Sequence, residues 1–234
     1  MTHSHAYSFV ALAPSTAKYE FTAPTAINTW GSLKFNNGTG ETDLIYATAK
    51  QTTVEGNTCP AAVNMTFNHM LSRVRFQFTN GMDDGSTLTV TDVKITNAYK
   101  SGTAELKAVF NELAWVTDEA TGELEFDNAT TTKFAQNASC VTGHKYMIPA
   151  TKAYQVTFKV TRTHNGVTDE YTHTVDLPAQ AMEPGKSYQF VATLTAKNIN
   201  PGQELCQIKF TAEVEEWGDN FTDKAFDVKS ATNN

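Results

Sequence analysis

Histidines are the first residues of this chain to consider as metal ligands or general bases, and His69 is the main candidate among six. It lies beside apolar positions, and no carboxylate or second histidine stands at ligand spacing from it. Its neighbours Asn68 and Ser72 suit local hydrogen bonding, so we predict a structural histidine that orders a strand break. His3 and His5 could chelate a metal from one face of a strand, although two histidines on a frayed terminus are the commoner situation.

Nucleophiles and paired acids give no recognisable constellation. The sequence holds no Gly-x-Ser-x-Gly elbow and no Cys/His pair that spacing can bring together. The acid pairs Asp83-Asp84 and Asp118-Glu119 lie in turns and fit neither a calcium loop nor a glycosidase, which places its carboxylates across a cleft. We therefore predict no catalytic residues, no metal and no cofactor, and hence no enzyme. Sequence alone leaves open an accidental Ser/His/Asp triad in space.

The three cysteines, Cys59, Cys140 and Cys206, lie far apart and form no C-x-x-C pair, which argues against a zinc site. An odd number permits at most one disulfide within the chain and a spare thiol. We expect buried, apolar cysteines.

The three tryptophans suggest carbohydrate binding, because sugars stack on exposed indoles. Trp217 follows a series of residues that face the core, which favours packing. Trp30 lies in a turn-rich stretch and is the best candidate for a surface aromatic.

Composition excludes several classes of protein. The formal net charge of −7 and the pI near 5.3 come without a basic stripe, which argues against a nucleic-acid partner. No stretch approaches the ~20 apolar residues of a membrane helix. The start of the chain lacks the basic and apolar regions of a signal peptide, so we expect either a removed leader or a start part-way into a longer protein.

Alternation with a period of two recurs along the chain, as expected for β-strands. The clearest case is residues 154–177, where Asn165-Gly166 predicts a two-residue type I′ turn. This turn fixes the register and places Val160 opposite Tyr171, Phe158 opposite His173 and Val156 opposite Val175. The apolar faces then match, and a slip of one residue would destroy the match.

Other stretches give further strand predictions. Residues 63–67 and 74–78 both alternate, and the change of apolar phase between them requires a helical turn or bulge around 68–72. A second phase shift occurs at Thr91–Asp92. Residues 113–126 resemble a weaker hairpin. Residues 208–214 are predicted to form the last strong strand. Glu213, Glu215 and Glu216 lie on its outer face, where their charges oppose pairing with the strand edge of another molecule.

These strands predict an all-β fold of two β-sandwich domains in tandem, of the transthyretin-like or Greek-key kind. We place an N-terminal domain, either whole or lacking its first strands, at residues 1–105, and a C-terminal domain with a terminal tail at residues 106–234.

The order of several short motifs resembles the fimbrillin-like (Mfa-like) family of Bacteroidota, the subunits of type V pili. The resemblance covers most of residues 43–217. Its motifs are Asp43-Leu-Ile-Tyr-Ala47, the segment from Val63 to Phe76 with Phe67-Asn-His-Met-Leu-Ser72, Val93 to Gly102, Met147-Ile-Pro149, Leu177 to Tyr188, and Ile208 to Trp217. Family members usually start with a lipoprotein leader and an acylated cysteine, whereas the first cysteine here is Cys59.

The resemblance implies a structural or accessory (tip or adhesin) subunit of a cell-surface fimbrium, exposed outside the cell and attached to the outer membrane through a lipid anchor. Its partners would be other fimbrial subunits and a host or bacterial surface ligand. Assembly by strand donation is also implied, and the tail after Asn220, where Phe226 and Val228 alternate with polar residues, is the candidate donor. A final edge strand of the same domain and a disordered tail are the plainer alternatives. A monomeric surface lipoprotein that binds a glycan or protein is the other function we consider.

Overall fold

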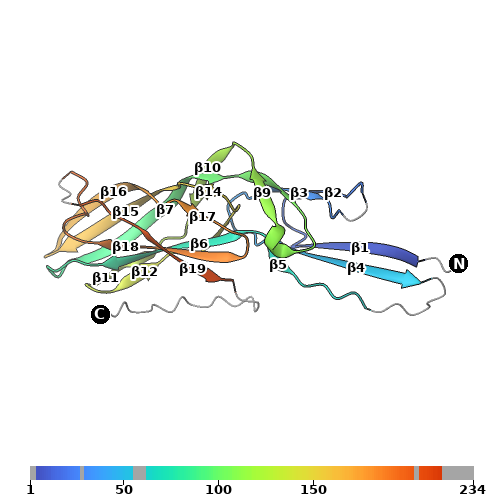
Figure 1. Ribbon diagram of the computed structural model, residues 1–234. Coiled ribbons are helices and arrows are strands. Elements are labelled where there is room, and N and C mark those ends of the chain that lie inside the picture. The colour runs from blue at the N-terminus through green and yellow to red at the C-terminus, as the bar shows by residue number, and fades with distance from the viewer. Residues whose placement is uncertain (1–3, 27–28, 55–61, 203–205, 218–234) are drawn as a thin grey trace.

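The computed structural model describes residues 4–26, 29–54, 62–202 and 206–217, and strands dominate them. Two lobes lie end to end, with β1 and β4 extending from one end of the molecule (Figure 1). One short 3-10 helix, Phe110–Glu112, accompanies the strands in these ranges. The all-β class predicted from the alternation is confirmed.

The large lobe is built from two five-stranded sheets. The first has the order β10-β7-β15-β16, with β11 also paired to β7, and the second has the order β12-β6-β18-β19, with β13 also paired to β6. The strands of the first are β7 (Thr87–Tyr99), β10 (Thr121–Glu125), β11 (Thr130–Phe134), β15 (Gln155–His164) and β16 (Val167–Asp176). Those of the second are β6 (Ser72–Asn80), β12 (Ser139–Val141), β13 (Lys145–Met147), β18 (Lys186–Leu194) and β19 (Thr211–Glu216).

The small lobe also has two sheets, with the orders β1-β4-β5 and β2-β3-β8-β9. Its strands are β1 (Ser4–Ala13), β2 (Tyr19–Thr22), β3 (Ser32–Asn36), β4 (Ile45–Val54), β5 (Asn68–His69), β8 (Ser101–Glu105) and β9 (Ala114–Thr117). A separate two-stranded pair joins β14 (Thr151–Lys152) to β17 (Gln180–Ala181).

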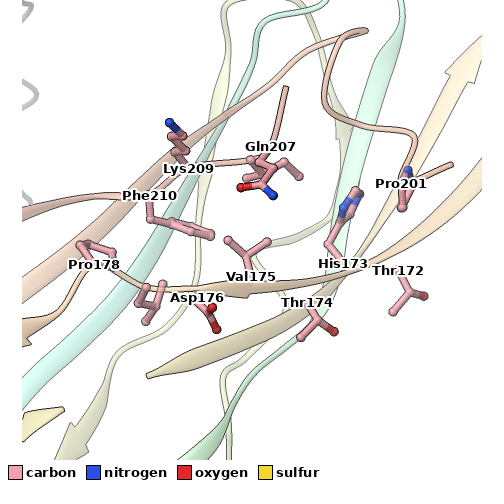
Figure 2. A pocket seen from close by; sticks show the side chains of 12 residues that line it. Thr172, His173, Thr174, Val175, Asp176, Pro178, Pro201, Gln207, Lys209 and Phe210 are labelled. Carbon is pink, nitrogen blue, oxygen red and sulfur yellow. The ribbon is translucent and has the colours of Figure 1, made fainter. Parts of the chain in front are cut away.

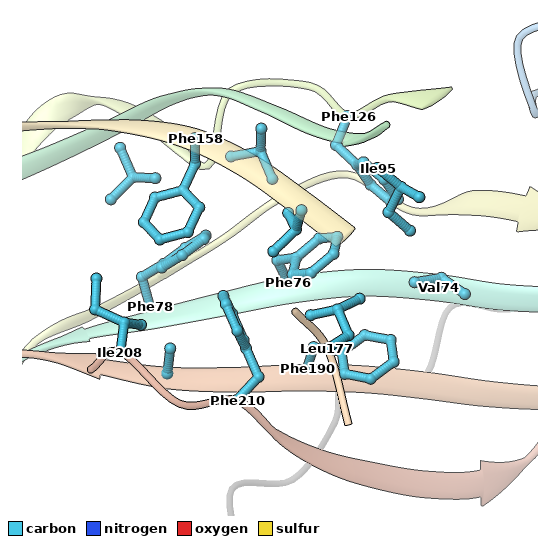
Figure 3. Close-up of a cluster of buried hydrophobic side chains, with 14 of the residues drawn as sticks. Val74, Phe76, Phe78, Ile95, Phe126, Phe158, Leu177, Phe190, Ile208 and Phe210 are labelled. Carbon is cyan, nitrogen blue, oxygen red and sulfur yellow. The ribbon is translucent and has the colours of Figure 1, made fainter. Parts of the chain in front are cut away.

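The core of the large lobe is an aromatic cluster between its two sheets (Figure 3). Phe76 of β6 is fully buried, and its ring centroid lies 4.9 Å from Phe126, 5.6 Å from Phe190 and 5.7 Å from Phe210. Each buried aromatic ring removes a large apolar area from water, so this cluster is the main source of stability in the lobe. A second buried cluster, around Leu33, Phe35 and Tyr46, forms the core of the small lobe.

The predicted hairpin is present in the predicted register. Val156 faces Val175, Phe158 faces His173 and Val160 faces Tyr171. Asn165 and Gly166 both have positive φ, 48° and 80°, as a type I′ turn requires. The phase shift at Thr91–Asp92 is also confirmed, because the register of β7 against β15 shifts there and Asp92 has a φ of 55°.

Three strand predictions are wrong. Residues 62–67 form no strand, and the phase change at 68–72 is instead a break at Met70–Leu71, where the chain passes from β5 in one sheet to β6 in another. Residues 113–126 form no hairpin, because β9 pairs with β8 while β10 pairs with β7. The last strand begins at Thr211, so Ile208 and Phe210 precede it.

The sheets do not divide at residue 105. The strands β6 and β7 lie before this residue, yet they pair with β18 and β15 from beyond it. The buried cluster of the large lobe accordingly joins Val74, Phe76 and Phe78 to Phe158 and Phe190. The division of the chain into separate units of residues 1–105 and 106–234 stays a prediction, and the shared sheets argue against it.

Polar side chains fix the alignment of β6 with β18, the parallel pair of this sheet. Arg73 Nε donates a hydrogen bond to Ser187 Oγ at 2.9 Å, and Arg75 Nε donates to Gln189 Oε1 at 2.7 Å. The amide of Gln189 in turn donates to Gln77 Oε1 and to Glu213 Oε2 of β19. Because such bonds form in one register only, they specify which residues lie side by side.

Candidate functional site

His69 is paired with a carboxylate that its sequence neighbourhood does not reveal. Its Nδ1 lies 2.9 Å from Oδ2 of Asp43, and both side chains are largely buried. The pairing of β4 with β5, in which Ile45 faces His69, brings the two residues together across 26 positions. Asn68 makes the local hydrogen bond expected of it, to the Thr66 carbonyl, whereas Ser72 donates to the distant carbonyl of Glu183. The predicted structural role of His69 fits this arrangement.

Trp217 is held between aromatic rings from both lobes. Its indole stacks on His69 at 3.8 Å between centroids and on Tyr146 of β13 at 5.3 Å, and the Arg73 guanidinium lies 5.1 Å from the ring. Its backbone N–H donates to the carbonyl of Gly185 at 3.0 Å. These contacts confirm that Trp217 packs.

Trp30 is not a surface aromatic, so that prediction is wrong. The indole is only 5% exposed and belongs to the core of the small lobe. The Lys50 amine lies 5.3 Å from its ring. A turn-rich neighbourhood does not determine whether a side chain is buried, and a large apolar ring gains most from burial.

Asp84 is a structural acid. Hydrogen bonds from the hydroxyl and backbone N–H of Ser86, together with Arg162 of β15, hold the pKa of Asp84 well below its usual value. The Arg162 Nε also donates to Ser86 Oγ at 2.9 Å, which ties the turn at 83–86 to the sheet. These partners account for the position of Asp84 without a ligand.

Replacing Asp84 by asparagine is expected to lower the free energy of unfolding at pH 7 by about 1 kcal/mol. The folded pKa is depressed, so the carboxylate stabilises the protein above its unfolded pKa, near 4, and this contribution is lost as the pH falls through the folded pKa. Urea unfolding between pH 7 and pH 2 should show the difference between the two proteins shrinking below about pH 4. Asp83→Asn, at the exposed neighbouring position, is the control. A difference that stays constant with pH would contradict the assignment.

The cysteines divide into a buried and an exposed thiol. Cys140 is buried, and burial raises the pKa of its thiol to about 12, as expected for an inert core residue. Cys206 is exposed, which the prediction of buried cysteines missed. Cys59, His3, Phe226 and Val228 lie outside the described residues.

A groove runs beside β16 in the large lobe (Figure 2). We name it the β16 groove. Its volume is about 470 Å³, and its walls are residues 172–178 on one side and Pro201 with residues 207–210 on the other. Figure 2 shows His173 and Val175 on the side facing Gln207 and Phe210, while Thr172, Thr174 and Asp176 point away.

The floor of the β16 groove is continuous with the core. His173 is 5% exposed and stacks on Phe158 with 5.2 Å between centroids. Phe210 is 6% exposed, and its ring packs edge-on against Phe76, Phe78 and Phe158. The irregular segment at 207–210 therefore closes the open side between the two sheets. Sequence reasoning missed this groove, because only the sheet order shows that β16 is an edge strand.

The described residues contain no group of three or more histidines, cysteines or acids that could hold a metal ion. In the same ranges, the structure has no helix with the length and apolar character of a membrane span. The features that stand out in the described residues are the side of β16 that no other strand pairs with, the groove beside it and the packing of Trp217 against His69 and Tyr146. Together they define a β-sheet protein whose distinctive surfaces are strand edges.

A model of the fimbrillin-like family matches residues 2–217, which is nearly the whole chain, and the protein belongs to this family. The family resemblance of the sequence motifs is thus confirmed. No curated protein gives a significant match.

Several solved structures resemble the chain at low identity. A candidate cell adhesion protein from Bacteroides uniformis is 16% identical with a TM-score of 0.45, over 90% of this chain and 73% of that one. One from Bacteroides ovatus is 16% identical with a TM-score of 0.49, over 91% and 68%. The fimbrial anchor protein Mfa2 from Porphyromonas gingivalis is 12% identical with a TM-score of 0.39, over 92% and 76%. At these scores the structural comparisons carry no argument of their own.

Proposed function

We propose that this protein is a subunit of a cell-surface fimbrium, either structural or accessory at the tip, with a mechanical rather than catalytic role. The observation that carries the proposal is the family match over residues 2–217, which includes every residue of both lobes that the structure describes. Its partners are other fimbrial subunits, and its place is outside the cell, attached to the outer membrane.

Assembly proceeds by strand donation from the segment that follows Trp217. In this segment Phe226 and Val228 alternate with Ala225, Asp227 and Lys229, so an extended chain presents both apolar side chains on one face. Main-chain hydrogen bonds to a sheet edge give affinity, and alternate side chains that enter pockets give specificity. The anchoring of Trp217 between His69 and Tyr146 supports this role, because it gives the segment a fixed starting point.

Deleting residues 218–234 is expected to abolish polymers while changing the melting temperature by less than about 2 °C, because residues before Trp217 already build the buried clusters that the structure describes in both lobes. Polymers are measured by size-exclusion chromatography and electron microscopy. The variant Phe226→Asp/Val228→Asp should reproduce the loss, whereas the matched control Ala231→Asp/Thr232→Asp should not. Polymers of normal length from the deleted chain would rule out donation by this segment.

The alternative of a monomeric module that binds a ligand through exposed aromatics loses its main support with the burial of Trp30. Trp115 and Trp217 are each engaged within the protein, the first through a hydrogen bond from its indole N–H to the Met70 carbonyl and the second through ring stacking. We therefore favour the fimbrial role.

A further inference from the structure

The turn between β15 and β16 carries an exposed Asn-Gly pair at the end of the large lobe that lies away from β1 and β4 (Figure 1). Asn165 and Gly166 are both exposed, and a Cβ built on Gly166 would meet no atom of the described residues within 4 Å apart from its chain neighbours. Asparagine is a chemically labile residue, and a following glycine, which has no Cβ, lets its backbone nitrogen approach the side-chain amide. This turn is therefore open to attack of that nitrogen on the amide.

The other two Asn-Gly pairs of the chain, at Asn37 and Asn80, are closed to this reaction. Asn80 is 0% exposed, and its amide nitrogen donates to the carbonyls of Ser86 and Phe134, each at 3.0 Å. Asn37 is 3% exposed, and its amide nitrogen donates to the Tyr146 carbonyl at 2.9 Å. Burial and these hydrogen bonds hold both side chains in place and keep out the water that the reaction consumes. The three pairs thus differ in environment and not in sequence.

His164, the last residue of β15, is placed to move protons at this amide. Asn165 Nδ2 donates a hydrogen bond to His164 Nε2 at 2.9 Å, so Nε2 is the acceptor and the proton of the neutral ring is on Nδ1. Nδ1 lies 4.0 Å from Oδ1 of Asp84. Hydrogen bonds from Ser86, together with Arg162, hold the pKa of Asp84 well below its usual value, so this group is a carboxylate. Its negative charge stabilises the imidazole ring when the ring takes up a second proton.

We propose that Asn165 is a site of self-assisted deamidation, with His164 as its catalytic acid–base group. The Gly166 nitrogen forms a bond to Cγ of Asn165 and loses its proton, which passes through solvent to His164. The Cγ–Nδ2 bond then breaks, and Nε2 gives the proton to Nδ2, which leaves as ammonia. Water opens the resulting cyclic imide at either carbonyl and leaves aspartate or isoaspartate. The net change is the uptake of one water molecule and the loss of one ammonia.

Isoaspartate at position 165 changes the length of the turn. The main chain then runs through the side-chain carbon, which adds one backbone atom to a loop of two residues. This loop fixes the register of β15 and β16, in which Phe158 faces His173 and the two rings stack at 5.2 Å between centroids. A longer turn no longer suits that register, so the modification loosens the hairpin. The site thus limits how long the folded protein lasts, whatever it assembles with.

The test follows the three Asn-Gly pairs in purified full-length protein incubated at neutral pH and physiological temperature. Peptide mapping by mass spectrometry detects the change of amide to carboxyl, and enzymatic methylation detects isoaspartate. Asn165 should convert while Asn37 and Asn80 stay intact in the same sample, because those two react only after local unfolding. Conversion of Asn165 no faster than that of Asn80 would overturn the proposal.

A pair of variants tests the role of the imidazole. His164→Gln should slow the conversion of Asn165 at least about tenfold, the loss expected when a positioned acid–base group is removed. The matched control Val167→Gln places the same side chain at the facing, 63% exposed position of the turn and keeps His164, so it should convert as the wild type does. Melting temperatures establish that both variants fold. An unchanged rate in His164→Gln, or equal slowing in both variants, would show that His164 is not the acid–base group.

The variant Asn165→Asp separates the effect of the new charge from that of the longer turn. It carries the carboxylate on an unchanged main chain, and Asp-Gly also suits a type I′ turn, so the freshly purified variant should melt as the wild type does. Incubated wild-type protein that is rich in isoaspartate should melt about 3 °C lower. Equal melting temperatures of the incubated and fresh wild-type proteins would contradict the loosening of the hairpin.

Discussion

Replacing Phe76 by alanine is expected to lower the free energy of unfolding by about 4 kcal/mol, a large part of the stability of a typical domain. Phe76 is fully buried and contacts the rings of Phe126, Phe190 and Phe210, which come from three other segments. The change removes the ring from the centre of the large lobe, and these neighbours cannot all move to fill the space.

Urea unfolding followed by tryptophan fluorescence measures this loss. Val116→Ala is the matched control, because Val116 is 72% exposed and its truncation should change stability by less than about 0.5 kcal/mol. A loss below about 1 kcal/mol for Phe76→Ala would contradict the packing described for the large lobe.

A fragment of residues 106–234 is expected not to fold alone. It lacks β6 and β7, which are the neighbours of β18 and β15 in the two sheets. Without them, the central edges of both sheets are open and the buried faces of Phe158 and Phe190 lose Phe76 and Phe78. We expect no cooperative thermal transition and aggregation through the open edges.

Circular dichroism and size-exclusion chromatography check this expectation. Refolding the fragment together with residues 1–105 should restore the native near-ultraviolet spectrum, since the mixture holds every strand. A cooperative transition of the fragment alone would instead support the boundary at residue 105 expected from the sequence.

The sequence predicts those parts of the fold that depend on neighbouring residues. The hairpin at 154–177 follows from alternation and one Asn-Gly pair, both of which act locally, and its register is as predicted. The 113–126 stretch shows the same kind of signal, but its two strands pair with β8 and β7 and not with each other. Alternation indicates that a strand forms, whereas its partner depends on residues far away in the chain.

The candidate sites show the same limit. The contact of His69 with Asp43 and with Trp217 depends on pairing between distant strands, and no local spacing reveals it. The burial of Trp30 depends on where β3 lies in the small lobe. The β16 groove could not be predicted from the sequence, because the residues of β16 do not show that it is an edge strand. Only the order of strands in the sheet shows this.

The parallel pairing of β6 with β18 has a consequence for biosynthesis. Arg73 and Ser187 bond across a separation of 114 residues, so β6 is made long before its neighbour exists. At 5–20 residues per second, the ribosome needs roughly 6–23 s to cover this distance. During that interval β6 has an unpaired side and exposed phenylalanines, and contacts of such long range form slowly even afterwards. We expect newly made chains to require a chaperone that holds them unfolded until synthesis is complete.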